Sequence, residues 1–288
     1  MIQAGTSTEP RTLAPPERRI ASISGVEPLG AYRVITALDG SGPDPRPGQF
    51  YMLAAEERWG GGADERPYLP RAFSYARARR VTDGLELDFL LESVGPGTER
   101  LAALEPDEGL ALVGPLGVGF RPPPAGARPI LVGGGIGVAP LVCLHDELLA
   151  VGPLPTLLLG FRTAAHAQAA ALFPDLAELA TDDGSVGRRA LVTELLRERL
   201  ADDPGGGAAS PAAVFACGPP AMLEAVRVVC AEHGVPAQLA LESGMACGFG
   251  ACFGCVVPTR TGYIRLCLDG PVIDAGVLET ALFPGSGH

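Results

Sequence analysis

The sequence predicts an α/β protein that begins with an antiparallel β-barrel, continues with a parallel α/β domain and ends in a small cysteine-rich module. Three observations support this. Short strand-like runs without helical periodicity extend from Arg18 to about Pro124. Strands, glycine turns and helices then alternate, and four cysteines lie close together near the end of the chain. A length of 288 residues also suits about two domains or slightly more.

The barrel is expected over residues 18–124, after a polar and proline-rich stretch, residues 1–17, that predicts a flexible tail. Regularly spaced short strands separated by turn residues are typical of antiparallel barrels. The segment 59–67, WGGGADERP, predicts a flexible insertion between strands. The clearest strand-like runs are 31–38, 49–55, 72–78, 85–92 and 110–116.

The α/β domain is expected over residues 125–236, because the proline-dense segment 121–129 marks a boundary. Alternation of strand and helix implies a parallel sheet. The last helix ends in Gly234, a normal helix C-cap. The expected order is strand 128–134, helix 138–152, strand 156–162, helix 189–200, strand 212–219 and helix 221–234.

The third unit, residues 237–288, is defined by its cysteines, Cys247, Cys252, Cys255 and Cys267. Their spacing, C-x4-C-x2-C and a fourth Cys after eleven residues, is the plant-type pattern for a 2Fe–2S cluster held by four thiolates. Gly248, Gly250 and Gly254 permit turns that aim backbone N–H groups at the sulfur atoms. Two other interpretations are open: a zinc site, although zinc sites favour C-x2-4-C pairs, and disulfides in an oxidising compartment.

Charge and composition limit the possible partners and the location. The chain carries 22 basic and 33 acidic side chains, a net charge of −11, which argues against nucleic acid and anionic membrane surfaces as partners. No apolar run reaches 18 residues and the N-terminus has no apolar signal region, so neither a membrane span nor secretion is expected. The three remaining cysteines lie in apolar segments, which suits a reducing cytoplasm.

Two segments of the α/β domain have the residue types of a dinucleotide site. GGGIGVAPL, residues 133–141, follows a buried strand and opens a helix, where backbone and helix N-terminus favour phosphate. ACGPPAML, residues 216–223, follows a later strand at the edge where open α/β sheets bind ligands, and Cys217 there could line a nicotinamide site. Taken singly, the first could be a simple glycine-rich turn and Cys217 a buried structural cysteine.

Two barrel segments could hold a second, flat and phosphorylated group. RAFS, residues 71–74, places a cation near an aromatic ring, and GPGT, residues 95–98, can present backbone N–H groups to a pyrophosphate. Each also has an ordinary interpretation, as a surface Arg beside a core Phe and as a β-turn.

The order of these motifs, together with GPLG at 114–117, resembles the ferredoxin–NADP reductase superfamily of flavoproteins. Within it the chain is most similar to the electron-transfer subunit of type B dihydroorotate dehydrogenase, whose cluster also follows the nucleotide domain. The stretch ESGMACGFGACFGCVV…CLDGPVID carries much of the likeness, and TDDGSVGRRALVT at 181–193 adds to it. The resemblance covers about residues 18–275.

The resemblance implies the residues of each site. FAD would contact Arg71, Ala72, Phe73, Ser74, Leu90, Leu91, Glu92, Gly97 and Thr98. NAD would lie against Gly133, Gly134, Gly135, Ile136, Gly137, Pro140, Cys217, Gly218 and Pro219, and the four cysteines would hold the 2Fe–2S cluster. Two departures stand out: Ala72 replaces a usual Pro, and Leu91-Glu92 replace a common Tyr-Arg, which puts an acid near the FAD phosphates.

The resemblance also implies the function, with no catalytic acid or base in this chain. Electrons from an FMN-containing dihydroorotate dehydrogenase catalytic subunit would pass through 2Fe–2S and FAD to NAD⁺, in pyrimidine biosynthesis, within a cytoplasmic heterotetramer. One alternative is a related FAD/2Fe–2S subunit of an NADH-dependent ferredoxin–NADP oxidoreductase, sulfide dehydrogenase or hydrogenase, and another is a zinc-binding module without enzymatic activity. NAD is favoured over NADP, although Arg162 follows a strand where a 2′-phosphate could sit. Phe249 and Phe253 are expected to contact either the partner subunit or the chain's own barrel.

Overall fold

Six antiparallel strands close into a barrel in the N-terminal part of the chain, in the order β1-β2-β7-β6-β3-β8. The structure, a computed structural model, describes residues 17–61, 66–152, 154–201, 211–283 and 285. The predicted tail therefore lies, except for Glu17, outside the described residues, as do residues 62–65 of the expected insertion. The barrel strands are β1 (Arg19–Leu29), β2 (Tyr32–Asp39), β3 (Phe50–Ala55), β6 (Arg71–Val81), β7 (Gly84–Leu91) and β8 (Gly109–Leu116).

The additional elements of the barrel lie beside its ends. Strands β4 (Gly60–Gly61) and β5 (Arg66–Pro67) pair with each other within the expected insertion. Helix α1 (Pro96–Ala102) begins in the GPGT segment, so this segment opens a helix rather than forming an isolated β-turn. Strand β1 and helix α1 are not among the elements expected from the sequence.

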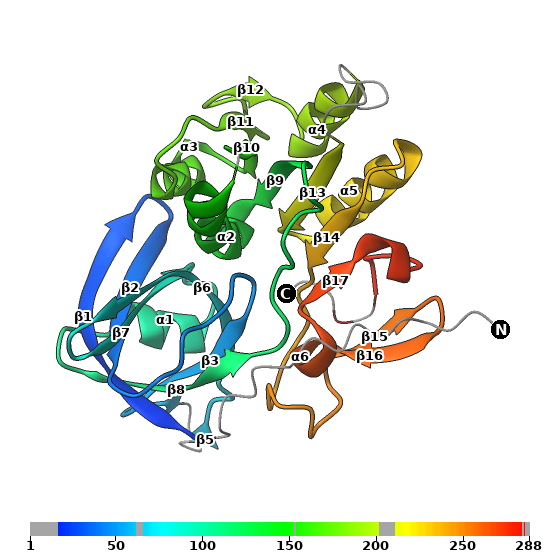
Figure 1. Cartoon of the computed structure of the whole chain (residues 1–288). Helices are drawn as coiled ribbons and strands as arrows, with labels where there is room; N and C mark the ends of the chain where they lie inside the picture. Colours follow the sequence, from blue (N-terminus) through cyan, green and yellow to red (C-terminus); the bar gives the residue numbers. More distant parts are fainter. Residues whose placement is uncertain (1–16, 62–65, 153, 202–210, 284, 286–288) are drawn as a thin grey trace.

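A seven-stranded sheet follows, in the order β12-β11-β10-β9-β13-β14-β17, with parallel pairing except at β17. Figure 1 shows this domain above the barrel, with helices on both faces of the sheet. Its strands are β9 (Arg128–Gly134), β10 (Thr156–Phe161), β11 (Glu178–Thr181), β12 (Arg188–Arg189), β13 (Ala212–Cys217), β14 (Ala237–Ala240) and β17 (Val272–Asp274). Its helical segments are η1 (Gly135–Val138), α2 (Ala139–Val151), α3 (Ala164–Ala167), η2 (Gln168–Leu172), α4 (Val192–Ala201) and α5 (Pro220–Glu232).

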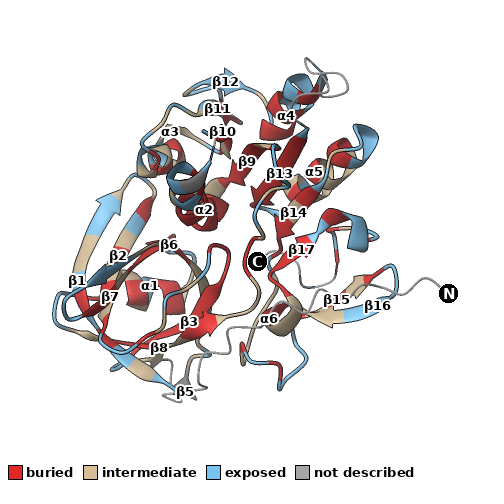
Figure 2. Ribbon diagram, viewed as in Figure 1, coloured by how far each residue is buried: buried red, intermediate tan, exposed pale blue. Residues whose placement is uncertain are grey.

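The central strands of this sheet are apolar along their whole length because both faces are covered. Ile130 and Val132 of β9 point into the core that α4 and α5 cover, whereas Leu131 points into the core under α2. Figure 2 shows these strands as buried. Helix α5 ends as expected, since Gly234 has φ +65°, the left-handed conformation that closes many helices.

The segment that carries the cysteines, residues 241–283, here called the cysteine segment, lies mainly beside the barrel and below the sheet in the view of Figure 1. It contains the hairpin β15 (Val256–Thr259) and β16 (Gly262–Arg265), helix α6 (Leu266–Asp269) and η3 (Ala275–Val277). Strands β14 and β17 also fall within residues 237–288, yet they belong to the seven-stranded sheet. The proposed domain boundaries stay a prediction, and the expected third unit shares two strands with its neighbour.

One apolar core joins the three parts. It includes Phe50 and Met52 on the outer face of the barrel, the sheet face under α5, and Cys255 and Cys267. Because side chains of all three parts pack in one cluster, burial of apolar surface holds the cysteine segment against both neighbours. Among the described residues no helix is long and apolar enough to cross a membrane.

Candidate functional site

A cavity of about 720 Å³ lies where the barrel, the glycine-rich turn after β9 and the start of the cysteine segment meet. Its volume is in the usual range for cofactor sites. Of the expected FAD and NAD residues it is lined by Arg71, Ala72, Phe73, Ser74, Leu90, Glu92, Thr98, Ile136, Gly137, Pro140 and Cys217. Two distant segments of the sequence, each interpreted as half of a redox site, therefore face one cavity.

The remaining expected residues lie behind this lining. Leu91 points into the barrel core, because neighbouring strand residues face opposite sides and Leu90 faces the cavity. Gly97 is buried beneath the side chain of Arg71. Gly133, Gly134, Gly135, Gly218 and Pro219 form the backbone support of the two turns rather than the cavity wall.

Arg71 is held at the barrel side of the cavity by its own strand and by α1. Its Nη1 donates to the carbonyl oxygen of Leu69 at 2.6 Å. Its guanidinium lies over Gly97 so closely that a Cβ at that position would be 2.9 Å from Nη2. A glycine at 97 thus lets the cation lie over the start of α1, beside the cavity.

The GPGT turn is organised by Thr98. The Thr98 hydroxyl accepts hydrogen bonds from the backbone N–H groups of Val94 (2.9 Å) and Gly95 (3.0 Å) and donates to the carbonyl of Gly95 at 2.9 Å. These two N–H groups are therefore directed at the hydroxyl instead of at a phosphate. From this geometry, the turn serves to hold the first residues of α1 in place beneath Arg71.

The two turns of the α/β domain touch backbone to backbone. A Cβ on Gly137 would lie 2.6 Å from the Cα of Gly218, so only glycine fits at that contact. Gly135 has φ +55°, which a residue with a side chain rarely adopts. This close approach brings Ile136, Pro140 and Cys217 to one wall of the cavity, at the carboxyl ends of β9 and β13.

Sequence reasoning missed a further part of the cavity wall, next to Cys217. Leu241, Glu242, Ser243, Gly244, Met245 and Ala246 all line it, in the segment that runs from β14 to the first cysteine. The sequence signal for this part of the wall is ESGMAC, which also begins the stretch that resembles the family's cluster segment. Phe50, Leu69, Pro70, Val94, Gly95, Ala139 and Pro271 complete the lining.

Burial raises the pKa of two groups in this wall, Glu242 and Cys217. Water in the cavity reaches Glu242, but protein atoms surround it, and this desolvation raises the pKa of its carboxyl group. Burial also raises the pKa of Cys217, and the nearby Glu242 raises it further. The Cys217 thiol at the end of β13 therefore stays uncharged, which suits the apolar face of a flat aromatic cofactor.

The four cysteines lie in one loop region but differ in exposure. Cys255 and Cys267 are buried with their sulfurs 3.2 Å apart, Cys247 is half-buried and Cys252 is exposed. Among the described residues no three Cys, His, Asp or Glu side chains converge closely enough for one metal ion. The fit to a cluster therefore depends on the close Cys255–Cys267 pair and on the donors around the thiols.

Backbone N–H groups point at these thiols. Burial opposes ionisation of Cys247, but the N–H groups of Cys252 and Phe249 outweigh it and lower the pKa of Cys247 to about 7. Burial and the adjacent Cys255 raise the pKa of Cys267 to about 12, while the N–H of Gly250 acts in the opposite direction. Backbone donors aimed at Cys247, Cys252 and Cys267 fit the negatively charged sulfur atoms of an iron–sulfur cluster.

Gly250 and Phe253 give the loop its shape. Gly250 has φ +85° and Phe253 has φ +60°, and Gly248 has φ +78°, so the chain takes the left-handed conformation three times between Cys247 and Cys255. Arg265 fastens the loop by donating to the Gly250 carbonyl at 2.9 Å, and its guanidinium lies 4.9 Å from the centre of the Phe253 ring.

Comparison with known proteins agrees with this geometry. Residues 242–279 match the family model described as the iron–sulfur cluster binding domain of dihydroorotate dehydrogenase B. The chain is 41% identical over 238 residues to the dihydroorotate dehydrogenase B (NAD(+)) electron transfer subunit of Bacillus caldolyticus, covering 80% of this chain and 86% of that protein. It is 38% identical over 237 residues to the subunit of the same name from Geobacillus sp. strain WCH70, covering 80% and 85%.

Among solved structures, one of an NADH-dependent reduced ferredoxin–NADP oxidoreductase superposes with a TM-score of 0.74 over 90% of both chains, at 23% identity. The ferredoxin reductase of carbazole 1,9a-dioxygenase superposes with a TM-score of 0.63 over 77% of this chain and 68% of its own, at 21% identity. The fold is thus of the ferredoxin–NADP reductase type, with an added iron–sulfur segment. Within that class, the chain belongs to the family of dihydroorotate dehydrogenase B electron transfer subunits.

Proposed function

We propose that this chain is the electron-transfer subunit of an NAD⁺-linked dihydroorotate dehydrogenase, and that it delivers electrons from an FMN-containing catalytic subunit to NAD⁺ in pyrimidine biosynthesis. The observation that carries the proposal is the segment 241–247. It lines the cavity from Leu241 to Ala246 and then supplies the first cysteine, Cys247. A cofactor in the cavity and a cluster in the loop would thus be separated by only a few consecutive residues of one segment.

The cavity lining and the cysteine loop support an assignment of residues to each group. Arg71, Phe73 and Ser74 of β6 would hold FAD, with the Arg71 guanidinium directed to its pyrophosphate. Cys247, Cys252, Cys255 and Cys267 would hold the 2Fe–2S cluster. Ile136, Pro140 and Cys217 would receive NAD at the ends of β9 and β13. When bound, FAD and the cluster supply the conversion between single-electron and hydride transfer, while the chain binds and orients them.

The catalytic subunit would dock on the exposed face of the cysteine loop. Phe249 is 54% exposed and Phe253 is 61% exposed, so about half or more of each ring is available to a partner. Their place in the loop between Cys247 and Cys255 would put the partner directly over the cluster. Buried free thiols at Cys143, Cys217 and Cys230 support a reducing, cytoplasmic setting for the assembly.

The test is co-expression with the FMN-type dihydroorotate dehydrogenase subunit of the same genome. We expect the purified complex to form NADH from dihydroorotate and NAD⁺ under anaerobic conditions. The chain alone should pass electrons from NADH to a dye but leave dihydroorotate unchanged. A colourless chain that contains zinc and no flavin would contradict the proposal, and activity restored only by a different type of partner would reassign the chain to a related reductase.

A matched pair of variants tests the cluster ligands. Cys255→Ala should remove iron and sulfide from the protein and reduce dihydroorotate-linked NADH formation to background, while FAD remains bound. Cys230→Ala is the control, because Cys230 is 1% exposed, compared with 3% for Cys255, but lies in α5 away from the loop. Full iron and sulfide in Cys255→Ala, measured by chemical analysis and by electron paramagnetic resonance of the reduced protein, would exclude Cys255 as a ligand.

A further inference from the structure

The residue that follows β10 stands where α/β dinucleotide sites distinguish NAD from NADP. Strand β10 lies next to β9, whose end carries the glycine-rich turn, and both strands end at the same edge of the sheet. In such folds an acid after the second strand binds the ribose 2′-hydroxyl of NAD, whereas an arginine accommodates the 2′-phosphate of NADP. Here that residue is Arg162. On this rule alone the site would accept NADP.

An acid nevertheless reaches this position, from the other domain. Glu92 follows β7 of the barrel, and its Oε1 lies 2.5 Å from Nη2 of Arg162. The same Glu92 oxygen is 3.5 Å from Nε2 of His166, and this nitrogen is 2.9 Å from Nη2 of Arg162. Glu92 also lines the cavity together with Ile136 of the glycine-rich turn. One carboxylate therefore faces both the arginine and the space where the coenzyme would lie.

The side chain of Glu92 is more enclosed by protein than the side chain of Arg162. The Glu92 side chain is 23% exposed and that of Arg162 is 64% exposed. His166 is fixed by the Thr163 hydroxyl, 2.9 Å from its Nδ1, and its ring meets Tyr32 edge-on with centroids 5.6 Å apart. Tyr32 begins β2 of the barrel. The α/β domain therefore meets the barrel here in two contacts, His166 with Tyr32 and Arg162 with Glu92. The Glu92 carboxylate is therefore held in place by its surroundings. The more exposed guanidinium of Arg162 is positioned by its contact with this carboxylate.

We propose that Glu92 selects NAD(H) over NADP(H) from outside the nucleotide domain. Its carboxylate neutralises Arg162, the cation that would otherwise bind a 2′-phosphate, and it repels that phosphate directly. The proposal refines the function proposed above and rests on it. It also accounts for an acid at a position where the family commonly has an arginine, because this carboxylate faces a cation of the neighbouring domain.

The size of the effect follows from Coulomb's law. Two like unit charges about 6 Å apart, at an effective permittivity of roughly 40, change affinity about tenfold, and a doubly charged phosphate increases the effect. Since Arg162 is largely exposed, salt should screen part of the discrimination. The ratio of kcat/KM for NADPH to kcat/KM for NADH is therefore the quantity to measure, at low and at physiological ionic strength.

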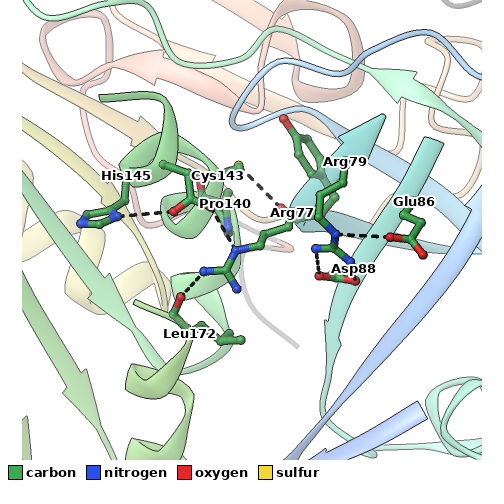
Figure 3. Close-up of polar contacts among 10 residues, drawn as sticks. Arg77, Arg79, Glu86, Asp88, Pro140, Cys143, His145 and Leu172 are labelled. Atoms are coloured by element: carbon green, nitrogen blue, oxygen red, sulfur yellow. Dashed lines mark hydrogen bonds and ion pairs between the residues drawn. The ribbon is translucent and has the colours of Figure 1, made fainter. Parts of the chain in front are cut away.

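The key variant is Glu92→Gln, which keeps the shape and removes the charge. We expect the NADPH:NADH ratio of kcat/KM to rise about tenfold or more, through KM. Glu92→Asp, which keeps the charge, should preserve most of the preference for NADH. The matched control is Glu86→Gln, in β7, the strand that Glu92 follows. Glu86 lies 3.3 Å from Arg79 (Figure 3) and does not line the cavity. This variant removes the same charge and should leave the ratio unchanged.

Binding gives a readout that does not depend on turnover. We expect adenosine 2′,5′-bisphosphate to bind Glu92→Gln about tenfold more tightly than the wild type in calorimetry, while 5′-AMP binds both proteins alike. Adding Arg162→Gln to Glu92→Gln should abolish this gain, because the freed cation is then absent. FAD content, measured in each variant, identifies any loss caused by a disturbed flavin site.

The outcomes separate the two levels of the proposal. An unchanged coenzyme ratio and unchanged bisphosphate affinity in Glu92→Gln would overturn the selection by Glu92, while leaving the electron-transfer function intact. A wild-type protein that uses NADPH as well as NADH would also overturn it. A wild-type protein that binds no FAD and oxidises neither coenzyme would instead refute the proposed function itself.

Discussion

Arg71 and Gly97 show how one glycine can serve a binding site through a neighbouring side chain. Any side chain at 97 would place its Cβ within 2.9–3.0 Å of the Arg71 guanidinium. Arg71 is the end of a flexible side chain, so it would move rather than unfold the barrel. The glycine therefore matters for where the cation lies, and little for the stability of the fold.

Gly97→Ala tests this separation. We expect FAD affinity to fall about tenfold, the value of roughly one charge-assisted hydrogen bond, by titration of the flavin-free protein. The melting temperature of the flavin-free protein should stay the same or rise, since alanine favours helix α1 by up to about 1 kcal/mol. Gly25→Ala on β1 is the control, because no atom lies within 4 Å of the added Cβ. Unchanged FAD affinity in Gly97→Ala would refute the placement of Arg71 at the flavin phosphates.

At the scale of single residues, the sequence predicted which segments line the cavity better than it predicted which side chain of each segment faces it. Arg71, Phe73, Ser74 and Cys217 line the cavity, as a flavin and nicotinamide site requires. Leu91 does not, because strand alternation turns its side chain into the barrel. The roles of Arg71, Phe73, Ser74 and Cys217 in binding FAD and NAD stay predictions.

Helix α5 is tied to the C-terminal segment through one acid. Glu224 accepts hydrogen bonds from Arg227 Nη2 (2.6 Å) and from the backbone N–H of Ala281 (2.6 Å). The Arg227 guanidinium is the main cause that holds the pKa of Glu224 at about 2; partial burial opposes it, and the Ala281 N–H reinforces it. The segment after η3 thus packs on α5 through a charged contact as well as through apolar side chains.

This contact predicts a pH-dependent contribution to stability. Because the folded-state pKa of Glu224 lies below its unfolded value, the contribution is present above about pH 5 and is lost as the pH falls toward about 2. Glu224→Gln should cost about 1–2 kcal/mol at pH 7, and the difference from the wild type should shrink between about pH 5 and pH 3.

Urea unfolding followed by circular dichroism measures this difference. Glu198→Gln serves as the control, because Glu198 pairs with Arg188 on the open surface and should shift the midpoint less. A Glu224→Gln penalty that is the same at pH 7 and pH 3 would show that ionisation of Glu224 is not its source.

At the level of elements, prediction succeeded where the local pattern was strong. The strands at 128–134 and 212–217 and the helix from Pro220 to Glu232 lie within two residues of the expected bounds. The short strands β11, β12, β14 and β17 were not expected, because they complete the sheet through neighbours rather than through their own periodicity. The exposed-to-buried alternation of a strand is weak when only three or four residues take part.

The barrel and the α/β domain are joined across the molecule by Arg77. Its Nε lies 3.0 Å from Asp146 Oδ2 on α2, and its Nη2 donates to the carbonyl of Leu172 (Figure 3). Nearby, the Cys143 thiol lies 3.8 Å from the carbonyl oxygen of Tyr75. Since α2 begins beside the glycine-rich turn, this contact helps to set how the barrel faces the nucleotide site.

A double-mutant cycle tests the contact between domains. We expect Arg77→Gln and Asp146→Asn to be coupled by about 0.5–1 kcal/mol, a modest value because both side chains are partly exposed. Limited proteolysis should also cut the linker 121–129 faster in both variants. The control is Arg80→Gln with Asp44→Asn, a more exposed pair within the barrel. Coupling near zero and unchanged linker cleavage would show that Arg77 does not hold the domains together.

The sequence alone was enough to recognise the cysteine pattern, the change from barrel to α/β rhythm, and the order of motifs that resembles the family. These are properties of residues that are close together in the sequence, so they can be recognised without the tertiary structure. Only the tertiary structure showed that residues 241–246 line the cavity and that Glu92 meets Arg162. Such contacts join segments 70 or more residues apart, and they arise because burial of a shared apolar core packs separate domains together.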